Sequence, residues 1–271
     1  IIFVGAQISG GISRSTLYID NVRITGCAAP ADPTLTKSFS PDAVAVGGTS
    51  TLTFVLSNPN PLPLMGAAFS DALPAGVEVA DPPQASTTCS GRPVWNPTAG
   101  DTMLSFSGGT IPADDSCTVH VNVIPTTAGP HPNVSSFIST AQTGTNSSAS
   151  GLASATLTAI LPPTIVKSFV PDTMMAGEAV TMTFIIENPN ADVALTGVSF
   201  MDMFPTLPGV MAVASPPNPT MEGCGSPIFV PAGPSAISFS RGTIPAGGTC
   251  TVQLRVTAPL SGTYTNTTTA V

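Results

Sequence analysis

The chain contains two lysines, and each can be matched with one aspartate and one asparagine further along the sequence. The two sets are Lys37, Asp71 and Asn133, and Lys167, Asp202 and Asn266. Where a fold brings such groups together, a lysine amine can be joined covalently to an asparagine side chain with help from the acid. We favour a simpler interpretation. Both lysines are solvated on edge strands, where lysine discourages aggregation, and each aspartate caps the Leu-Pro or Phe-Pro turn after it.

The five cysteines include no C-x-x-C pair, which argues against a zinc site. Cys89 and Cys224 each follow a Pro-Pro dipeptide and a polar loop, whereas Cys117 and Cys250 each follow a Thr-Ile-Pro-Ala turn and begin a strand. These matching positions predict disulfides Cys89–Cys117 and Cys224–Cys250, in an oxidising compartment; the alternative is four reduced, buried thiols. For Cys27 we expect a partner upstream, rather than another subunit or a free thiol.

The residues of common catalytic sites are sparse. His120 and His131 are the only histidines, and they fall on the polar face of a strand and in a loop between two prolines. No Gly-x-Ser-x-Gly motif accompanies them, and one recurring aspartate per domain does not make a glycosidase pair. Asp114-Asp115 could contact calcium, but glycines replace them in the second copy, which favours a hydrophilic turn. We therefore predict that the chain is not an enzyme and holds no cofactor or metal.

The elements that position these residues are repeated. Lys-Ser-Phe-x-Pro-Asp at 37–42 and Asn-Pro-Asn at 58–60 recur 130 residues later, and Gly-Thr-Ile-Pro-Ala at 109–113 recurs after 133. The second copy has therefore gained three residues, net, in its middle loops. Strict alternation of apolar and polar residues predicts half-buried antiparallel strands. It occurs in Thr51–Leu56, Cys117–Val123, Val180–Ile186 and Cys250–Val256.

We therefore predict an all-β fold of two tandem immunoglobulin-like antiparallel β-sandwiches, preceded by an extra strand segment. The domains are 1–31, 32–161 and 162–271. The repeated motifs, in order and twice, resemble the immunoglobulin-like repeats of unknown function in large bacterial surface and secreted proteins. The resemblance implies an extracellular tandem-repeat stalk without catalytic residues. Within the first segment, residues 15–24 resemble the last strand of a jelly-roll domain.

Charge and composition restrict the partners. Only 8% of residues are charged, the net charge is −8, and 42% of residues are apolar. Because the chain has no basic patch and no apolar run long enough for a membrane span, we expect neither nucleic acid nor a spanning segment. The expected partners are further copies of the chain or neighbouring repeats of a longer one, outside the cell.

Two classes of function fit this sequence. The first is structural: a stalk, fibre or filament subunit of a bacterial cell surface. The second is an adhesin module that binds a host or polysaccharide ligand through its loops. Trp95, the only tryptophan, discriminates between them, because an exposed loop tryptophan favours an adhesin. Phe229 stands near the matching position in the second copy, which suggests a core role and favours the structural class.

The strand pattern also predicts an incomplete second sandwich. After Asn133 the first copy has two strand-like runs, Val134–Thr140 and Leu152–Ile160, whereas only five residues follow Asn266. The missing strand would leave a hydrophobic groove and unpaired backbone groups. Ile2, Val4, Ala6 and Ile8 alternate along a candidate donor strand. One hypothesis is that this strand completes the next subunit head to tail, giving a filament; the other is that the ends mark where a longer protein was cut.

Overall fold

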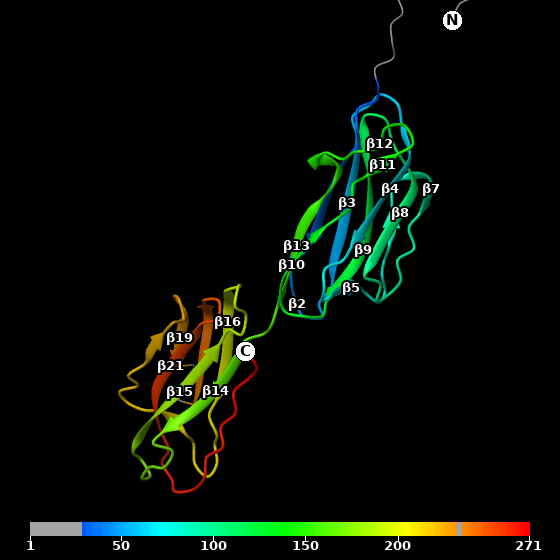
Figure 1. The fold of residues 1–271 in the computed structure, drawn as a ribbon. Helices are drawn as coiled ribbons and strands as arrows, with labels where there is room; N and C mark the ends of the chain where they lie inside the picture. Colours follow the sequence, from blue (N-terminus) through cyan, green and yellow to red (C-terminus); the bar gives the residue numbers. More distant parts are fainter. Residues whose placement is uncertain (1–28, 232–234) are drawn as a thin grey trace, which may run out of the picture.

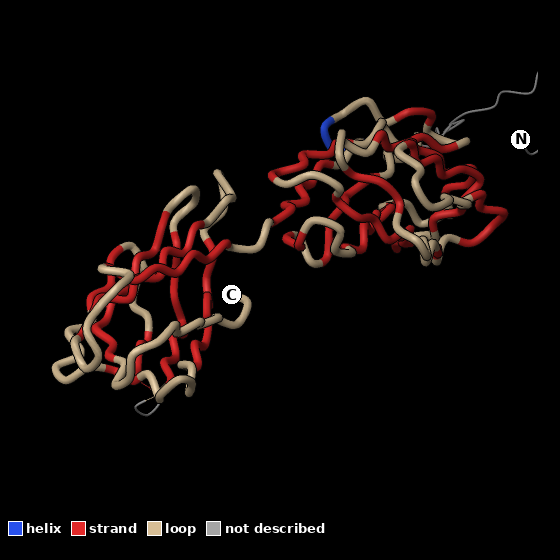
Figure 2. Tube along the Cα trace, turned by 90° about the horizontal axis from the view of Figure 1, so that it is seen from below, coloured by secondary structure: helices blue, strands red, loops and turns tan. Residues whose placement is uncertain are grey.

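The computed structural model describes residues 29–231 and 235–271, and it forms two β-sandwiches joined in tandem (Figure 1). The prediction of an all-β fold is confirmed: strands dominate both halves, and the described residues include a single short 3₁₀ helix (Figure 2). No helix in this described part of the chain is long and apolar enough to cross a membrane. Cys27, the residues 15–24 and the proposed donor residues Ile2, Val4, Ala6 and Ile8 lie outside the described residues.

The first sandwich spans β1 to β13. Its elements are β1 (Thr34–Ser40), β2 (Ala43–Ala45), β3 (Ser50–Asn58), β4 (Leu64–Ala72), β5 (Val77–Val79), β6 (Ser86–Thr87), β7 (Ser90–Val94), β8 (Met103–Ile111), β9 (Asp115–Pro125), β10 (Gly129–Val134), β11 (Ser139–Thr140), β12 (Gly144–Thr145), the 3₁₀ helix Ala149–Gly151 and β13 (Ser154–Ile160). One sheet has the order β1-β3-β9-β5, with β6 also paired to β9, and the other has the order β12-β11-β4-β8-β7.

The second sandwich repeats most of this plan. Its strands are β14 (Thr164–Val170), β15 (Ala179–Glu187), β16 (Leu195–Met203), β17 (Ala212–Val213), β18 (Thr220–Glu222), β19 (Ile228–Pro231), β20 (Ala236–Ile244) and β21 (Thr249–Thr257). The sheets are β14-β15-β21-β17, with β18 on β21, and β16-β20-β19. The matching edge strands β1 and β14 carry the two lysines, and the two Asn-Pro-Asn motifs lie at the end of β3 and directly after β15.

The core follows from the alternation seen in the sequence. In β3 the side chains of Leu52, Phe54 and Leu56 are fully buried, and the intervening residues, which are polar except for Val55, are half-buried. The central pair β3 and β9 is antiparallel in continuous register from Ser50 opposite Val123 to Asn58 opposite Asp115. Burial of these apolar rows stabilises each sandwich by about 25 cal/mol for every Å² removed from water.

A third, small sheet distinguishes the first sandwich. β13 lies between β10, to which it is antiparallel, and β2, to which it is parallel. Its Leu157 and Ala159 are buried. The predicted run Val134–Thr140 is not one strand, because Val134 ends β10 and β11 pairs instead with β4 and β12. In the described part of the second repeat no strand takes the place of β13, and the C-terminal segment runs along the sandwich edge (Figure 1).

Candidate functional site

The first repeat brings Lys37, Asp71 and Asn133 together inside the sandwich. Lys37 lies on β1 between the inward-facing Leu35 and Phe39, so the alternation of the strand directs its side chain into the protein. Its Nζ contacts both Asp71 Oδ2, from β4, and Asn133 Oδ1, from β10. The three residues therefore come from three strands that are far apart in the sequence.

Every polar atom of this set has a partner. Asn133 Nδ2 donates to Asp71 Oδ1 at 2.7 Å and to the carbonyl oxygen of Ala72 at 2.9 Å. Asp71 thus touches the lysine with one carboxylate oxygen and the asparagine amide with the other. The side chains of Lys37 and Asp71 are both fully shielded from solvent. Burial lowers the pKa of Lys37, and the hydrogen bond and charge of Asp71 act in the opposite direction.

The second repeat assembles the same residue types with one contact fewer. Lys167 Nζ donates to Asp202 Oδ1 at 3.1 Å, and Asn266 Nδ2 donates to Asp202 Oδ2 at 2.9 Å. Asn266 Oδ1 is buried and has no hydrogen-bond partner. Burial also lowers the pKa of Lys167, against the opposing effect of Asp202. Lys167 Nζ and Asn266 Oδ1 are therefore not hydrogen-bonded to each other, unlike Lys37 Nζ and Asn133 Oδ1 in the first repeat.

These positions correct two expectations. Both lysines do lie on edge strands, but their side chains point inward and are not solvated. Neither Asp71 nor Asp202 caps the turn after it, because each carboxylate is buried and faces the lysine and asparagine. The sequence does indicate the inward direction of these side chains, because each lysine occupies a position that the alternation of its strand reserves for apolar, inward-facing residues.

An aromatic row lines each set. Lys37 Nζ lies 5.2 Å from the centre of the Phe54 ring, and Phe54 and Phe69 have ring centres 4.6 Å apart. In the second repeat the corresponding distances are 5.8 Å for Lys167 to Phe184 and 4.8 Å for Phe184 to Phe200. These rings help to exclude water from the amines, and their faces attract an amine in its charged form.

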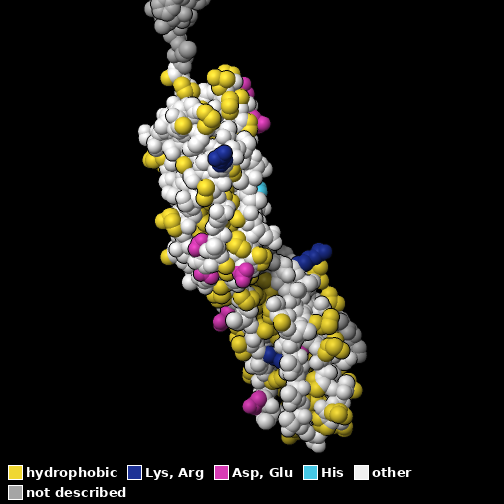
Figure 3. All heavy atoms as spheres, turned by 90° about the vertical axis from the view of Figure 1, so that its right-hand side faces the viewer, with side chains coloured by type: hydrophobic (Ala, Val, Ile, Leu, Met, Phe, Trp, Pro, Cys, Tyr) yellow, Lys and Arg dark blue, Asp and Glu magenta, His cyan; other side chains and the backbone are white. Residues whose placement is uncertain are grey.

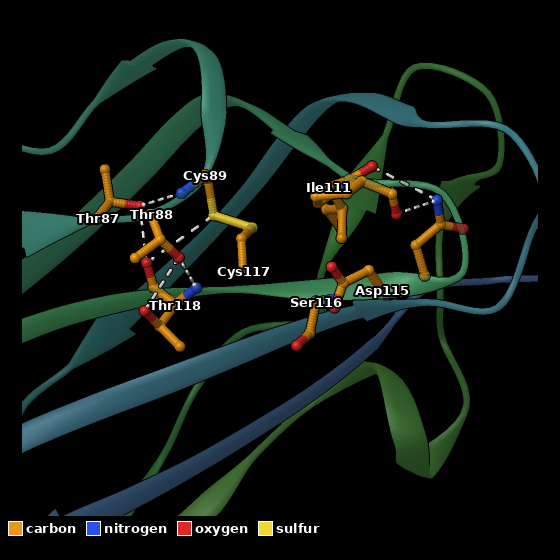
Figure 4. The surroundings of a disulfide bond; sticks show 10 residues. Thr87, Thr88, Cys89, Ile111, Asp115, Ser116, Cys117 and Thr118 are labelled. Carbon is orange, nitrogen blue, oxygen red and sulfur yellow. Dashed lines mark hydrogen bonds between the residues drawn. A yellow bond between two sulfur atoms is a disulfide. The ribbon is translucent and has the colours of Figure 1, made fainter.

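Each sandwich contains one disulfide, between the cysteines that the repeat positions pair. Cys89 is bonded to Cys117 and Cys224 to Cys250, with sequence separations of 28 and 26 residues. Figure 4 shows the first bond beside a network in which the Thr88 hydroxyl accepts from the backbone of Thr118 at 2.8 Å. All four sulfurs belong to buried residues. The bonds fasten the loop before β7 or β19 to the start of β9 or β21.

The Asn-Pro-Asn motifs have a role that turn signals alone did not reveal. Asn60 accepts a hydrogen bond from the Ala31 backbone at 2.8 Å and donates to the Ala31 carbonyl at 2.9 Å. Asn190 binds Leu161 in the same two-bonded way, at 2.7 and 2.8 Å. Each repeat therefore binds the backbone of the segment that leads into it.

His131 and Trp95 are buried and interact with backbone carbonyl groups of the first sandwich. His131 lies in β10, not in a loop, and is buried with its Nδ1 3.1 Å from the carbonyl oxygen of Ala75. Trp95 is 8% exposed, and its indole N–H donates to the carbonyl of His120 at 3.0 Å. Over residues 29–231 and 235–271 there is no cluster of three or more His, Cys, Asp or Glu side chains that could hold a metal ion.

A groove of about 340 Å³ opens in the second repeat. Its lining residues include Thr173 and Met174 and the stretch from Gly262 to Tyr264. These residues match β2 and the start of β10 in the first repeat, between which Leu157, Ala159 and Ile160 of β13 lie. The groove is therefore the place that β13 fills in the first sandwich.

Similar solved structures are distant in sequence. The C-terminal domain of the AgI/II polypeptide BspA of Streptococcus agalactiae has 11% identity over 88% of this chain and 94% of its own, with a TM-score of 0.42. The type II cohesin dyad of the ScaA scaffoldin of Acetivibrio cellulolyticus has 13% identity over 87% of each chain and a TM-score of 0.29. A putative membrane anchored protein of Corynebacterium diphtheriae has 8% identity over 87% of this chain and 90% of its own, with a TM-score of 0.30.

The family comparison is more direct. No curated protein matches this sequence. One family model matches twice, over residues 33–159 and 163–271, which are close to the two repeats recognised from the sequence motifs. The chain therefore belongs to the family described as Domain of unknown function (DUF7933), of which it contains two copies in tandem.

Proposed function

We propose that this chain is an extracellular structural protein, a stalk or fibre subunit of a bacterial cell surface. Two buried disulfides support an oxidising location, because such bonds persist outside the cytosol. The few Lys and Arg side chains on the face seen in Figure 3 stand apart from one another, so this face has no basic patch that would attract a nucleic acid or an anionic lipid. The tandem architecture supports a mechanical role.

The joint between the repeats carries the proposal. Only Leu161, Pro162 and Pro163 separate the end of β13 from the start of β14. Prolines stiffen a linker, and both backbone groups of Leu161 are held by Asn190 of the second repeat. Asn60 holds Ala31 in the same way ahead of the first repeat. A short linker that is hydrogen-bonded to the repeat after it limits bending between repeats. This suits a chain that acts as a spacer.

Small-angle X-ray scattering tests this joint. The 271-residue chain should scatter as one rod of constant length, and Pro162→Gly with Pro163→Gly and Asn190→Ala should shorten its mean length and broaden its distribution. A control variant, Pro61→Gly with Pro63→Gly in an exposed turn of the first repeat, should scatter like the original chain. An original chain as flexible as the joint variant would contradict a spacer role.

The adhesin alternative gains no support from Trp95. Its ring is buried against Phe106, with ring centres 6.2 Å apart, and its only polar group is already bonded. Tryptophan anchors of binding surfaces are instead available to the partner. Specific binding of the chain to one glycan or one host protein, abolished by loop substitutions, would favour the adhesin function over the stalk.

The groove of the second repeat favours assembly by strand addition as part of the same structural function. We propose that the N-terminal residues 1–9 of a second copy occupy it. Ile2, Val4, Ala6 and Ile8 alternate as the inward Leu157 and Ala159 of β13 do. A donated strand supplies main-chain hydrogen bonds and apolar side chains together. Deletion of 1–9 should abolish concentration-dependent polymers in gel filtration; an intact chain that stays a monomer at every concentration would rule strand addition out.

A further inference from the structure

Lys37 occupies an environment that a lysine rarely enters. Its side chain is fully shielded, and the chain has no other lysine except Lys167, which lies at the matching position. Lysine is almost never fully buried unless it is paired, because removing its charge from water is energetically unfavourable. The pairing with Asp71 offsets part of that cost, but it does not explain why an asparagine amide completes the set.

The three side chains place a nucleophile, the Lys37 amine, against an amide carbonyl, that of Asn133, with the Asp71 carboxyl group beside both. Lys37 Nζ lies against the carbonyl end of the Asn133 amide, while the amide nitrogen is bonded to Asp71. The same carboxyl group contacts the lysine nitrogen through its other oxygen. A proton can therefore pass from the lysine nitrogen to the amide nitrogen through one carboxyl group, without water.

We propose that Lys37 and Asn133 form an intramolecular amide bond, with Asp71 as the proton-transferring acid. The lone pair of the neutral Nζ attacks Cγ of Asn133, the new Nζ–Cγ bond forms and the Cγ–Nδ2 bond breaks. One proton moves from Nζ through Asp71 to Nδ2, which leaves as ammonia. Atoms and electrons balance without an oxidant, reductant or cofactor. The bond would be a covalent modification within the first repeat. This inference does not depend on the proposed function.

The surroundings favour each step. The amine must be neutral to attack, and burial lowers the pKa of Lys37 in that direction. Phe54 and Phe69 keep water from the site, which suppresses hydrolysis of the amide. The fold holds the two reacting groups in contact, which replaces the entropy cost of bringing them together. Release of ammonia from the protein makes the step irreversible.

The bond would connect the first strand of the repeat to β10. It would close residues 37–133 into a covalent loop that contains most of the first sandwich, including the disulfide Cys89–Cys117. Tension along the chain would then pass from β1 to β10 through the side chains, and the residues between them could not be extended.

Mass spectrometry of the full chain tests the proposal. After reduction of the disulfides, digestion should yield a branched peptide that joins the segments containing Lys37 and Asn133, and its mass should be one ammonia below the sum of the two. Asn133→Ala, Lys37→Arg and Asp71→Ala should each abolish this species. Asn122→Ala, which removes an asparagine from the polar face of β9, should retain it.

Two results would overturn the inference. One is a folded chain, shown by its circular dichroism and its disulfides, in which the peptides containing Lys37 and Asn133 are recovered separately with full masses. The other is a loss of ammonia that persists in both Asn133→Ala and Lys37→Arg, since it would arise elsewhere in the chain. The original chain is sufficient for the first result, so it stands even if a variant fails to fold.

Discussion

Asn133 and Asn266 occupy matching positions in the two repeats, but only Asn133 accepts a hydrogen bond from its lysine. Asn266 Oδ1 is buried without a hydrogen-bond partner, and Lys167 Nζ donates to Asp202 but not to Asn266. Asn133 lies in β10, which β13 holds in place along six paired positions from Gly129 to Val134. In the described residues, the segment with Asn266 belongs to no strand, and it is held by the isolated bridge between Asp202 and Thr268 and by hydrogen bonds between Thr269 and Met201. The asparagine therefore contacts its lysine in the repeat where a neighbouring strand holds the segment that carries it.

This difference predicts unequal reaction in the two repeats. In chain newly made by cell-free synthesis, the Lys37–Asn133 branched peptide should form first, and its Lys167–Asn266 counterpart should lag or stay incomplete. The reason is that a misplaced reacting group costs orders of magnitude in rate. Quantification of both branched peptides over time measures this. Equal yields at the earliest times would show that strand support does not control the reaction.

The disulfides should contribute separately to the stability of each repeat. Replacing Cys89 and Cys117 together by alanine should lower the free energy of unfolding of the first sandwich by about 3–4 kcal/mol, because the bond restricts the unfolded chain over a loop of 28 residues. Urea denaturation, followed by the fluorescence of Trp95, reports on the first repeat. The matched pair Cys224→Ala and Cys250→Ala should leave that transition unchanged.

The stability of an uncoupled first repeat should depend on pH through Lys37. In Asn133→Ala the amine stays free, and its folded pKa lies below its ordinary value of 10.5 because of burial. Between the two pKa values the unfolded chain binds a proton that the folded chain has released, so stability rises with pH in that window and falls as pH is lowered through it. Urea midpoints across the alkaline range measure the slope.

A double variant provides the control. Lys37→Met together with Asn133→Ala removes the titrating amine, and the slope in that window should disappear. If the slope persists, it originates from another group, and the lowered pKa of Lys37 is not its cause.

Much of the fold was predictable because it depends on local alternation and repetition. The strands around Phe54, Phe184, Cys117 and Cys250 follow the period of two, and the disulfide partners follow from equivalent positions. The burial of Lys37 was not predicted, since a lysine was assumed to be solvated whatever its place in the alternation. Its environment depends on β4 and β10, whose positions come from pairing across the whole repeat.

The β13 strand should account for a measurable part of the stability of the first sandwich. Leu157 is fully buried between β10 and β2, so Leu157→Ala should lower the free energy of unfolding by about 2–5 kcal/mol. Thr156→Ala, on the exposed face of the same strand, should change it by no more than about 0.5 kcal/mol. A similar effect of both substitutions would indicate that β13 is not packed as described.

The groove of the second repeat should accept a strand like β13, and filling it should complete the neighbouring site. A synthetic peptide with the sequence of residues 154–160 should bind the chain, because its leucine and second alanine match the side chains that enter the equivalent place in the first sandwich. Pairing with this strand should order the segment that contains Asn266 and bring its carbonyl to Lys167.

The yield of the Lys167–Asn266 branched peptide should therefore rise when the peptide is present during cell-free synthesis of the chain, whereas the Lys37–Asn133 yield should not change. A peptide in which aspartate replaces the leucine is the matched control, since a buried unpaired charge prevents insertion. Equal yields with both peptides would show that the groove does not take a strand. A rise with the first peptide alone would connect strand addition to the covalent closure of the repeat.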